Sequence, residues 1–405
     1  MEAPLIDVPN GTVTTPRGFL AGASAAGIRS DTPGRLDLAL LVAEQRVGAA
    51  AVYTTNRFQA PPLRVTQRHL ADGQAQAVIV NAGCANALTG QQGKRDAQEM
   101  AELTAAKLSL AVDDVVVAST GVTGWLLPME RIRDGLGRIL PSKDGGDAFA
   151  RAIMTTDTVA KQAAVQFEWD GVTYTVGGVA KGSGMIHVNM ATMLAFLTTD
   201  APVDGAILTS LLRETADASF NQLTIDNATS TNDMALLLAS GAAGGETIGG
   251  DHPALPLLGA ALQQVATTLT RKLARDGEGA GKLLEVRVDG AATIEEARRA
   301  AKTVAGSMLL KAAVFGNDPN WGRVLDAVGY SNVEAEEERL ALAIQAVEVY
   351  RGGEPVPFDE AALSQALAQS DVHIHVDLGA GEATATAWGC DLTPEYVRIN
   401  SEYTT

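Results

Sequence analysis

Hydrophobic and polar residues alternate with two different periods along this chain, which predicts a mixture of strands and helices. Apolar residues take every second position at Val165, Phe167 and Trp169, and again over 172–176, on the two sides of Asp170-Gly171. Alternation of this kind around an Asp-Gly pair is typical of a β-hairpin closed by a type I′ turn. The sequence therefore predicts one well-defined hairpin before its midpoint.

Apolar residues recur at helical spacing in four other segments. We predict helices at residues 94–108, 205–218, 254–275 and 293–310. The last of these begins with Thr293-Ile-Glu-Glu296, a capping box in which the Thr and Glu side chains satisfy the first backbone N–H groups of a helix.

Short apolar runs and a second alternating pair predict further strands. The runs lie at residues 76–80, 115–119 and 284–288, and the pair lies at 372–378 and 383–388. A turn at Gly379-Ala-Gly381 would close this pair as a second hairpin. Hairpins mixed with helices favour a layered α/β (α+β) fold with a largely antiparallel sheet over a βαβ array. With 405 residues the chain is long enough for two domains, and we place a boundary near residue 282.

The composition narrows the function more than the fold. Hydrophobic residues make up 46% of the chain and charged residues 20%, as in globular proteins. The net charge is -17 and no Lys/Arg block occurs, which argues against nucleic acid or an anionic membrane as a partner. No run reaches the roughly 18 apolar residues of a membrane span, and the N-terminus lacks the pattern of a signal peptide. Two cysteines, Cys84 and Cys390, are too few for a disulfide framework, so we expect a reduced, cytoplasmic compartment.

The segment from Lys181 to Leu194 carries the most specific chemical pattern. A lysine and a Gly-Ser-Gly loop precede the Ala191-Thr192 bond, and the apolar run 193–197 follows it. A threonine hydroxyl is a weak nucleophile, but a cut before Thr192 would expose an α-amine, with an ordinary pKa of ~8, that could act as its base. Because the predicted hairpin leads straight into this loop, we place the bond at the edge of a sheet. An ordinary strand entered through a glycine loop is the alternative that this segment alone favours.

Other polar patterns are weaker on their own. The turn 119–124 follows a predicted strand, and its N–H groups and a Thr hydroxyl could face an oxyanion, although the sequence alone favours a simple strand-end turn. The Gly-rich segment 277–282 lacks the Ser/Thr of a phosphate loop, but its Glu278 could bind an amine. His373 and His375 share one face of a predicted strand without a visible third ligand, so we predict no metal site.

Eight blocks occur in a fixed order along the whole chain. They are 18–22 with 26–28, 54–59, 119–124, 154–158, 181–194, 230–233, 315–323 and 398–403. Taken together, these blocks resemble the self-cleaving ornithine acetyltransferases, also called glutamate N-acetyltransferases. Two turns depart from the pattern expected of this family. One turn carries Ala82 and Cys84, and the other, at 226–229, lacks the expected Gly-Asp pair. Neither departure touches the nucleophile, so they concern local turns and not the reaction class.

The resemblance implies an αββα layered sandwich over residues 1–282, similar to N-terminal-nucleophile hydrolases but differently connected. It implies a smaller α/β domain over residues 283–405, whose C-terminus reaches the active site. It also implies that the precursor cuts itself between Ala191 and Thr192. The two products, residues 1–191 and 192–405, would stay together, and two such pairs would form an α2β2 heterotetramer.

The same resemblance implies a ping-pong transfer of acetyl from N2-acetyl-L-ornithine to L-glutamate through an acetyl ester on Thr192. Thr120 and Gly121 match the oxyanion-hole pair. The positions that match substrate contacts are Thr155 (with Thr156 as the adjacent alternative), Lys181, Thr192, Glu278, Asn400 and Thr405. No cofactor is implied, and the sequence leaves open whether acetyl-CoA also serves as an acetyl donor to glutamate.

Two other classes of function fit part of the pattern. A self-cleaving aminopeptidase or amidase would use the same Thr192 but deliver the acyl group to water. An amino-acid-binding protein would remain a single uncut chain. The set formed by Lys181, Glu278 and Asn400 suits amino-acid recognition, which favours the transferase.

Overall fold

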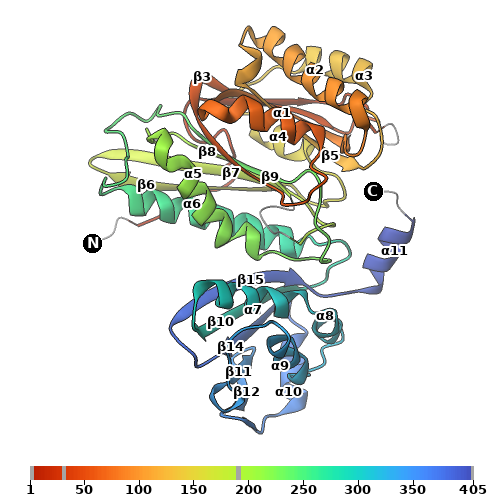
Figure 1. The fold of residues 1–405 in the computed structure, drawn as a ribbon, viewed down its shortest axis with the longest axis vertical. Helices are drawn as coiled ribbons and strands as arrows, with labels where there is room; N and C mark the ends of the chain where they lie inside the picture. The colour runs from red at the N-terminus through yellow and green to blue at the C-terminus, as the bar shows by residue number, and fades with distance from the viewer. Residues whose placement is uncertain (1–3, 30–32, 188–192, 403–405) are drawn as a thin grey trace.

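The computed structural model of the chain describes residues 4–29, 33–187 and 193–402. It contains two β-sheets with separate hydrophobic cores, which Figure 1 shows as an upper and a lower lobe. The first sheet ends before residue 240 and the second begins after residue 282. No helix in the described part of the chain is long and apolar enough to cross a membrane. The fold is mixed α/β, as the sequence predicts.

The first sheet has nine strands among the described residues. They are β1 (Ile6–Asp7), β2 (Phe19–Ser24), β3 (Leu38–Tyr53), β4 (Gln74–Cys84), β5 (Val115–Val122), β6 (Lys161–Trp169), β7 (Val172–Lys181), β8 (Leu194–Thr199) and β9 (Met234–Ala239). Their spatial order is β1-β6-β7-β8-β9-β3-β4-β5, and β2 pairs with β3. Most neighbours are antiparallel, but β4–β5 and β8–β9 are parallel.

Helices cover both sheets. Those of the upper lobe are α1 (Pro61–His69), α2 (Gly90–Leu108), α3 (Met129–Arg138), α4 (Gly146–Ala152), α5 (Gly205–Asp217) and α6 (Leu255–Arg275). Those of the lower lobe are α7 (Ile294–Gly306), α8 (Met308–Phe315), α9 (Gly322–Gly329) and α10 (Glu360–Leu367). The helix α11 (Pro394–Glu402) follows the second sheet and returns to the upper lobe, where Tyr396 contacts Asp226.

The long strand β3 joins two halves of the first sheet, which pack face to face. Side chains of a strand alternate between its faces, so Leu41 of β3 enters a core shared with Phe196 of β8, whereas Leu40 packs beneath α2 and α3. On β8, the neighbour Leu197 faces the opposite way, into a core with α5 and α6. The layers are therefore helix, sheet, sheet, helix, which confirms the predicted αββα sandwich.

The second sheet has six strands in the described part of the chain. They are β10 (Leu283–Ala291), β11 (Ala341–Ile344), β12 (Val347–Arg351), β13 (Glu354–Pro355), β14 (Asp371–Asp377) and β15 (Ala383–Cys390), in the order β13-β12-β11-β14-β10-β15. One face packs on α7, where Val286 and Ile374 share a core with Val304. The first strand of this sheet begins one residue after the predicted boundary at 282, and we keep the division into 1–282 and 283–405 as a proposal.

Three of the four predicted helices and one predicted hairpin are located correctly. Segments 94–108, 205–218 and 254–275 are α2, α5 and α6, with small shifts at their ends. Strands β6 and β7 form the predicted hairpin. Asp170 and Gly171 have φ angles of 49° and 75°, the two positive values that a type I′ turn requires.

The predictions of one unbroken helix and of a second strand pair were less successful. The segment 293–310 is two helices, because the chain turns at Ser307, whose hydroxyl accepts from Leu310 N and caps α8. The second hairpin is wrong, since β10 lies between β14 and β15 and pairs with both. Alternation shows which face of a strand is buried, but it does not identify the neighbouring strand.

The strand that follows the expected cleavage segment is not an edge strand of the sheet. Strand β8 is interior, with β7 on one side and β9 on the other. A continuous apolar run is typical of such a strand, which is buried on both faces. The Ala191-Thr192 bond itself lies outside the described residues.

The core between the two halves of the sheet should dominate the stability of the upper lobe. Phe196 is fully buried and packs edge-on against Phe149, with ring centroids 5.4 Å apart. We expect Phe196→Ala to lower the free energy of unfolding by about 3–5 kcal/mol, because it leaves a cavity between two close-packed layers. Urea unfolding at neutral pH measures this loss. Phe58→Ala is the matched control: its side chain is 67% exposed, and a comparable loss there would contradict the explanation.

Candidate functional site

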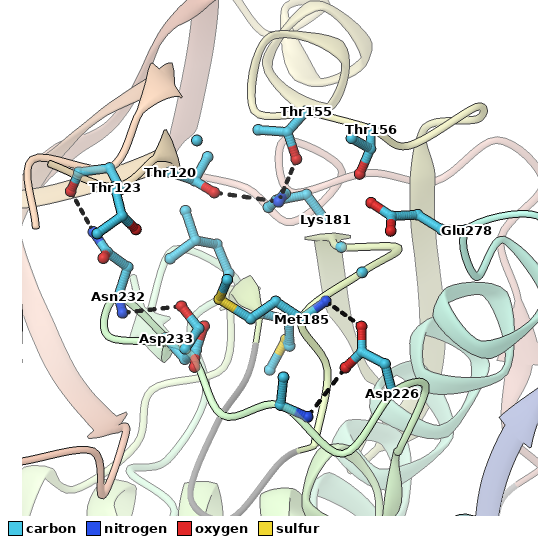
Figure 2. A pocket seen from close by; sticks show the side chains of 18 of the residues that line it. Thr120, Thr123, Thr155, Thr156, Lys181, Met185, Asp226, Asn232, Asp233 and Glu278 are labelled. Carbon is cyan, nitrogen blue, oxygen red and sulfur yellow. Dashed lines mark hydrogen bonds between the residues drawn. The ribbon is translucent and has the colours of Figure 1, made fainter. Parts of the chain in front are cut away.

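A cavity of about 180 Å³ lies where strand ends of the upper lobe meet α11. Its walls come from the ends of β5 and β7, the start of β8, the loop before β9, the turn after α6, and α11. Figure 2 shows polar side chains that point into it from several sides. Seven residues singled out from the sequence line this one cavity: Thr120, Gly121, Thr155, Thr156, Lys181, Glu278 and Asn400.

Three predicted residues cannot be placed. Ala191, Thr192 and Thr405 lie outside the described residues. Met193, which is bonded to Thr192, does line the cavity. The expected nucleophile is therefore one residue away from a described wall of the site.

Lys181 is the last residue of β7, and its side chain is buried in the cavity wall. Its Nζ donates to Thr155 Oγ1 at 2.8 Å and to Thr120 Oγ1 at 3.2 Å (Figure 2). Burial lowers the pKa of Lys181, and the carboxylates of Asp157, Asp233 and Glu278 oppose that shift. An ammonium group has three N–H donors, and two of them have these partners among the described residues. The third is available to a ligand.

Thr120 and Gly121 form the end of β5 beside β4. Because Thr120 Oγ1 accepts from Lys181, its own O–H is available to donate to another acceptor. Gly121 has a φ of 128°, and a Cβ there would lie 2.3 Å from the carbonyl carbon of Gly83. Only glycine fits this close approach. The strand end can therefore present a hydroxyl donor from Thr120 beside the cavity.

Glu278 and Asn400 meet on the opposite side, although they are far apart in the sequence. Asn400 Nδ2 of α11 donates to Glu278 Oε2 at 2.8 Å. The backbone N of Glu278 donates to the carbonyl of Ser183 at 2.8 Å, which holds it against the loop after β7. A Cβ on Gly184 would lie 2.3 Å from the Glu278 carboxyl carbon. The Gly-Ser-Gly loop is thus shaped to admit this carboxylate.

A buried ion network behind the cavity was missed by sequence reasoning. Lys161 Nζ lies 2.6 Å from Asp157 Oδ1 and 2.5 Å from Asp276 Oδ2. Asp157 also accepts from the backbone N of Thr155 at 3.0 Å and of Gly182 at 2.6 Å. It therefore positions the two segments that carry Thr155 and Lys181. The spacing of Asp157 and Lys161 gave no usable signal, because a four-residue spacing brings side chains together on a helix and neither residue lies in one.

Asp226 is a second carboxylate that the sequence analysis did not assign. It accepts from the backbone N atoms of Met185, Ile186 and Ala228 at 2.6, 2.8 and 3.1 Å, and two of these contacts appear in Figure 2. The Tyr396 hydroxyl of α11 donates to it at 3.3 Å, and burial raises the pKa of that hydroxyl. Asp226 joins the loop after β7, the loop before β9 and α11.

The two histidines on β14 have acidic partners across the sheet. His373 Nδ1 lies 3.3 Å from Glu285 Oε1, and His375 Nε2 lies 2.7 Å from Asp289 Oδ2. Among the residues that the structure describes, no group of three or more His, Cys, Asp or Glu side chains is arranged to hold a metal ion. These histidines lie beside acidic side chains on an exposed face of the sheet.

The fold and the site together define a class of protein. It is a two-sheet α/β sandwich with a buried, charged cavity at the ends of its central strands. The chain belongs to the ArgJ family, whose model matches residues 20–405. It is 51% identical over 401 residues to the arginine biosynthesis bifunctional protein ArgJ of Geobacillus kaustophilus, covering 98% of this chain and 97% of that protein. It is 45% identical over 405 residues to the protein of the same name from Dehalococcoides mccartyi, covering both chains completely. A solved structure of the arginine biosynthesis bifunctional protein ArgJ from Bacillus halodurans is 45% identical to this chain. The two superimpose with a TM-score of 0.51, over 52% of this chain and 100% of the solved chain.

The ion network predicts how stability depends on pH. Burial raises the pKa of Asp157, but the ammonium groups of Lys181 and Lys161 outweigh it and bring the pKa to about 2, below the ordinary 3.8. A lowered carboxyl pKa stabilises the fold above pH ~4, by about 2 kcal/mol here, and this contribution is lost as pH falls through ~2.

We therefore expect Asp157→Asn to be less stable than the wild type at pH 6. The difference between their free energies of unfolding should be about 1 kcal/mol smaller at pH 3. Urea unfolding at the two pH values measures it. Asp147→Asn is the control, because that carboxylate is half-exposed and pairs with Arg151 at the surface. A gap that is the same at both pH values would show that Asp157 does not titrate in this way.

Proposed function

We propose that the chain cuts itself before Thr192 and then transfers acetyl from N2-acetyl-L-ornithine to L-glutamate through an ester on the Thr192 hydroxyl. As a member of the ArgJ family, the chain is a bifunctional acetyltransferase of arginine biosynthesis. The observation that carries the specific mechanism is the convergence of Thr120, Gly121 and Lys181 on a cavity that Met193 also lines. An acyl transfer needs a nucleophile, a base and donors for the oxyanion at one point.

The proposed first step acetylates the enzyme. The α-amine of Thr192 accepts the proton of its own hydroxyl as Oγ1 attacks the acetyl carbonyl. The developing oxyanion is held by the Thr120 hydroxyl and the Gly121 N–H, each worth about 3 kcal/mol in the transition state. Collapse of the intermediate breaks the amide bond, releases ornithine and leaves acetyl on Thr192. Glutamate then attacks this ester and leaves as N-acetylglutamate.

The charges of the cavity suit both amino acids. Lys181 has a free N–H direction and would pair with the α-carboxylate that ornithine and glutamate share. Glu278 would attract the side-chain ammonium of ornithine. The Asn400 amide beside Glu278 carries a donor as well as an acceptor, so the same region can also contact the side-chain carboxylate of glutamate. Thr155, Thr156 and Thr405 are proposed as further contacts.

The length of a solved relative supports the cut. All of the Bacillus halodurans chain aligns with about half of this chain, the share expected of one product of a cut near the middle. Residues 1–191 and 192–405 would then form one active unit. We propose an α2β2 assembly of two such units, acting in the cytoplasm, with acetyl-CoA as the acetyl donor of the second activity.

Removing the proposed nucleophile tests the cut and the transfer together. We expect Thr192→Ala to remain a single chain of 42.0 kDa with no acetyl transfer, because it lacks the hydroxyl that both reactions need. Intact mass and N-terminal sequencing of wild type and variant measure this. A wild-type sample without a second N-terminus at Thr192 would contradict the proposal. Ornithine release that glutamate does not accelerate would instead indicate an amidase.

The oxyanion site can be tested by its hydroxyl. We expect Thr120→Ala to lower kcat for transfer about 10²-fold with a small change in KM, because the lost donor acts on the transition state. Thr123→Ala is the matched control, since it removes a hydroxyl from the rim of the same cavity without touching Lys181. Equal rates for Thr120→Ala and wild type would remove Thr120 from the mechanism.

A further inference from the structure

Asp233 is a buried acid in the cavity that the mechanism above does not use. It directly precedes β9, is 4% exposed and lines the cavity. Its Oδ2 has no hydrogen-bond partner among the described residues. Asp226, by contrast, accepts three backbone N–H groups. Buried polar atoms are nearly always paired, so an unpaired carboxyl oxygen inside a cavity indicates a ligand contact.

The sheet places Asp233 next to the strand partner of Met193, the residue that is bonded to Thr192. Strands β8 and β9 run parallel with Leu194 opposite Met234, and Met234 N donates to the carbonyl of Met193 at 3.0 Å. On the other side of β8, Leu194 is opposite Lys181. Asp233 and Lys181 therefore flank the start of β8, and Met193 there is bonded to Thr192. A substrate whose α-carboxylate meets Lys181 would have its α-amino nitrogen near Asp233.

The surroundings of Asp233 favour its neutral form. Burial raises its pKa well above the ordinary value, and hydrogen bonds from Ser230 and attraction by Lys181 offset this only in part. The other charged groups that line the cavity are Arg29, Asp226 and Glu278, and Asp157 lies behind Lys181. A carboxyl whose pKa is raised by burial keeps its proton at higher pH than an ordinary aspartate does, so it is better suited to act as an acid.

We propose that Asp233 is the catalytic acid and base that exchanges a proton with the amino groups of the two substrates. The proposal rests on the proposed function. In the first half-reaction the Thr192 hydroxyl proton reaches the departing nitrogen through the α-amine of Thr192. Asp233 adds a second proton to that nitrogen. Ornithine therefore leaves with an ammonium group, and Asp233 is left as a carboxylate. In the second, glutamate enters as an ammonium and returns that proton to Asp233. Its neutral amine then attacks the ester. One of the two protons left on that nitrogen passes to Thr192 Oγ1 as the ester bond breaks, and the other stays on the amide nitrogen of N-acetylglutamate.

This step has a chemical need behind it. Free amino groups with a pKa of ~8 or higher are mostly protonated at neutral pH, and an ammonium has no lone pair with which to attack an ester. In the first half-reaction the α-amine of Thr192 carries the hydroxyl proton to the departing nitrogen, so the second proton of the ornithine ammonium must come from another group, which is then left able to take a proton from glutamate. A second group is required, and the proton count of Asp233 is the same before and after a full cycle.

The test compares two acetyl donors in Asp233→Asn. p-Nitrophenyl acetate releases an aryl oxide that needs no proton, whereas N2-acetylornithine releases an amine that does. We expect kcat for the amide donor to fall about 10²-fold, while the burst of nitrophenol from the aryl ester stays within a few-fold of wild type. The burst amplitude also counts the cut, active chains. The acetylated variant should react slowly with glutamate near neutral pH. The rate of this reaction should recover as the pH rises, because glutamate then loses its ammonium proton to solvent.

Asp226→Asn is the matched control, since it removes another cavity carboxylate with a structural role and should slow both donors by the same factor. If Asp233→Asn also slows both donors equally, Asp233 is structural and the proposal is overturned. A wild-type enzyme that shows no burst would refute the acetyl-threonine mechanism instead, so the two failures are distinguishable.

A measurement on the wild type covers the case in which Asp233→Asn fails to fold or to cut itself. The active form of Asp233 in the first half-reaction is the protonated one. We therefore expect kcat/KM for N2-acetylornithine to fall as pH rises through the pKa of Asp233, and that for p-nitrophenyl acetate to lack this fall. Identical basic limbs for the two donors would overturn the proposal.

Discussion

The cavity depends on one buried cation, the Lys161 ammonium between Asp157 and Asp276. Lys161 begins β6, and Asp276 follows α6 and also accepts from Thr158 N at 3.0 Å. Asp157 extends the network to Thr155 and Gly182. Three segments that are separate in the sequence, 155–161, the loop at Gly182 and the turn at Asp276, are thereby fixed relative to one another. Removing the cation would leave two buried carboxylates without the ammonium group that they share, a costly arrangement.

This network also sets the charge that a substrate meets. Two lysines, Lys161 and Lys181, face the carboxylates of Asp157 and Asp276, so the deep wall is close to neutral. Glu278 and Asp233 are additional acids at the cavity surface. Lys181 is thus the basic group presented directly to a ligand by β7, and its pKa is lowered by burial but supported by these acids. A lysine placed among acids suits an amino acid held by its carboxylate, with its amino groups directed toward the acids.

Apolar spacing alone located α2, α5 and α6, because helical periodicity is a local signal. The αββα layers and the grouping of Thr120, Lys181 and Glu278 in one site came from the resemblance to a known family, which spans the whole chain. The pairing of β10 with both β14 and β15 could not be found in this way, because strand neighbours are chosen by packing over long distances. Asp157 and Asp233 were missed for a related reason. Their chemistry comes from burial, and burial is a property of the finished fold.

The order of strands in the upper lobe has a consequence for the two halves of a cut chain. Strands β8 and β9 are inserted between β7 and β3, so the later half of the chain is sandwiched by the earlier half on both sides. Such pieces would be interleaved and could not be pulled apart as two preformed bodies. Their association and their folding would be a single event, and the resistance of the mature complex to denaturation would then rise with its concentration.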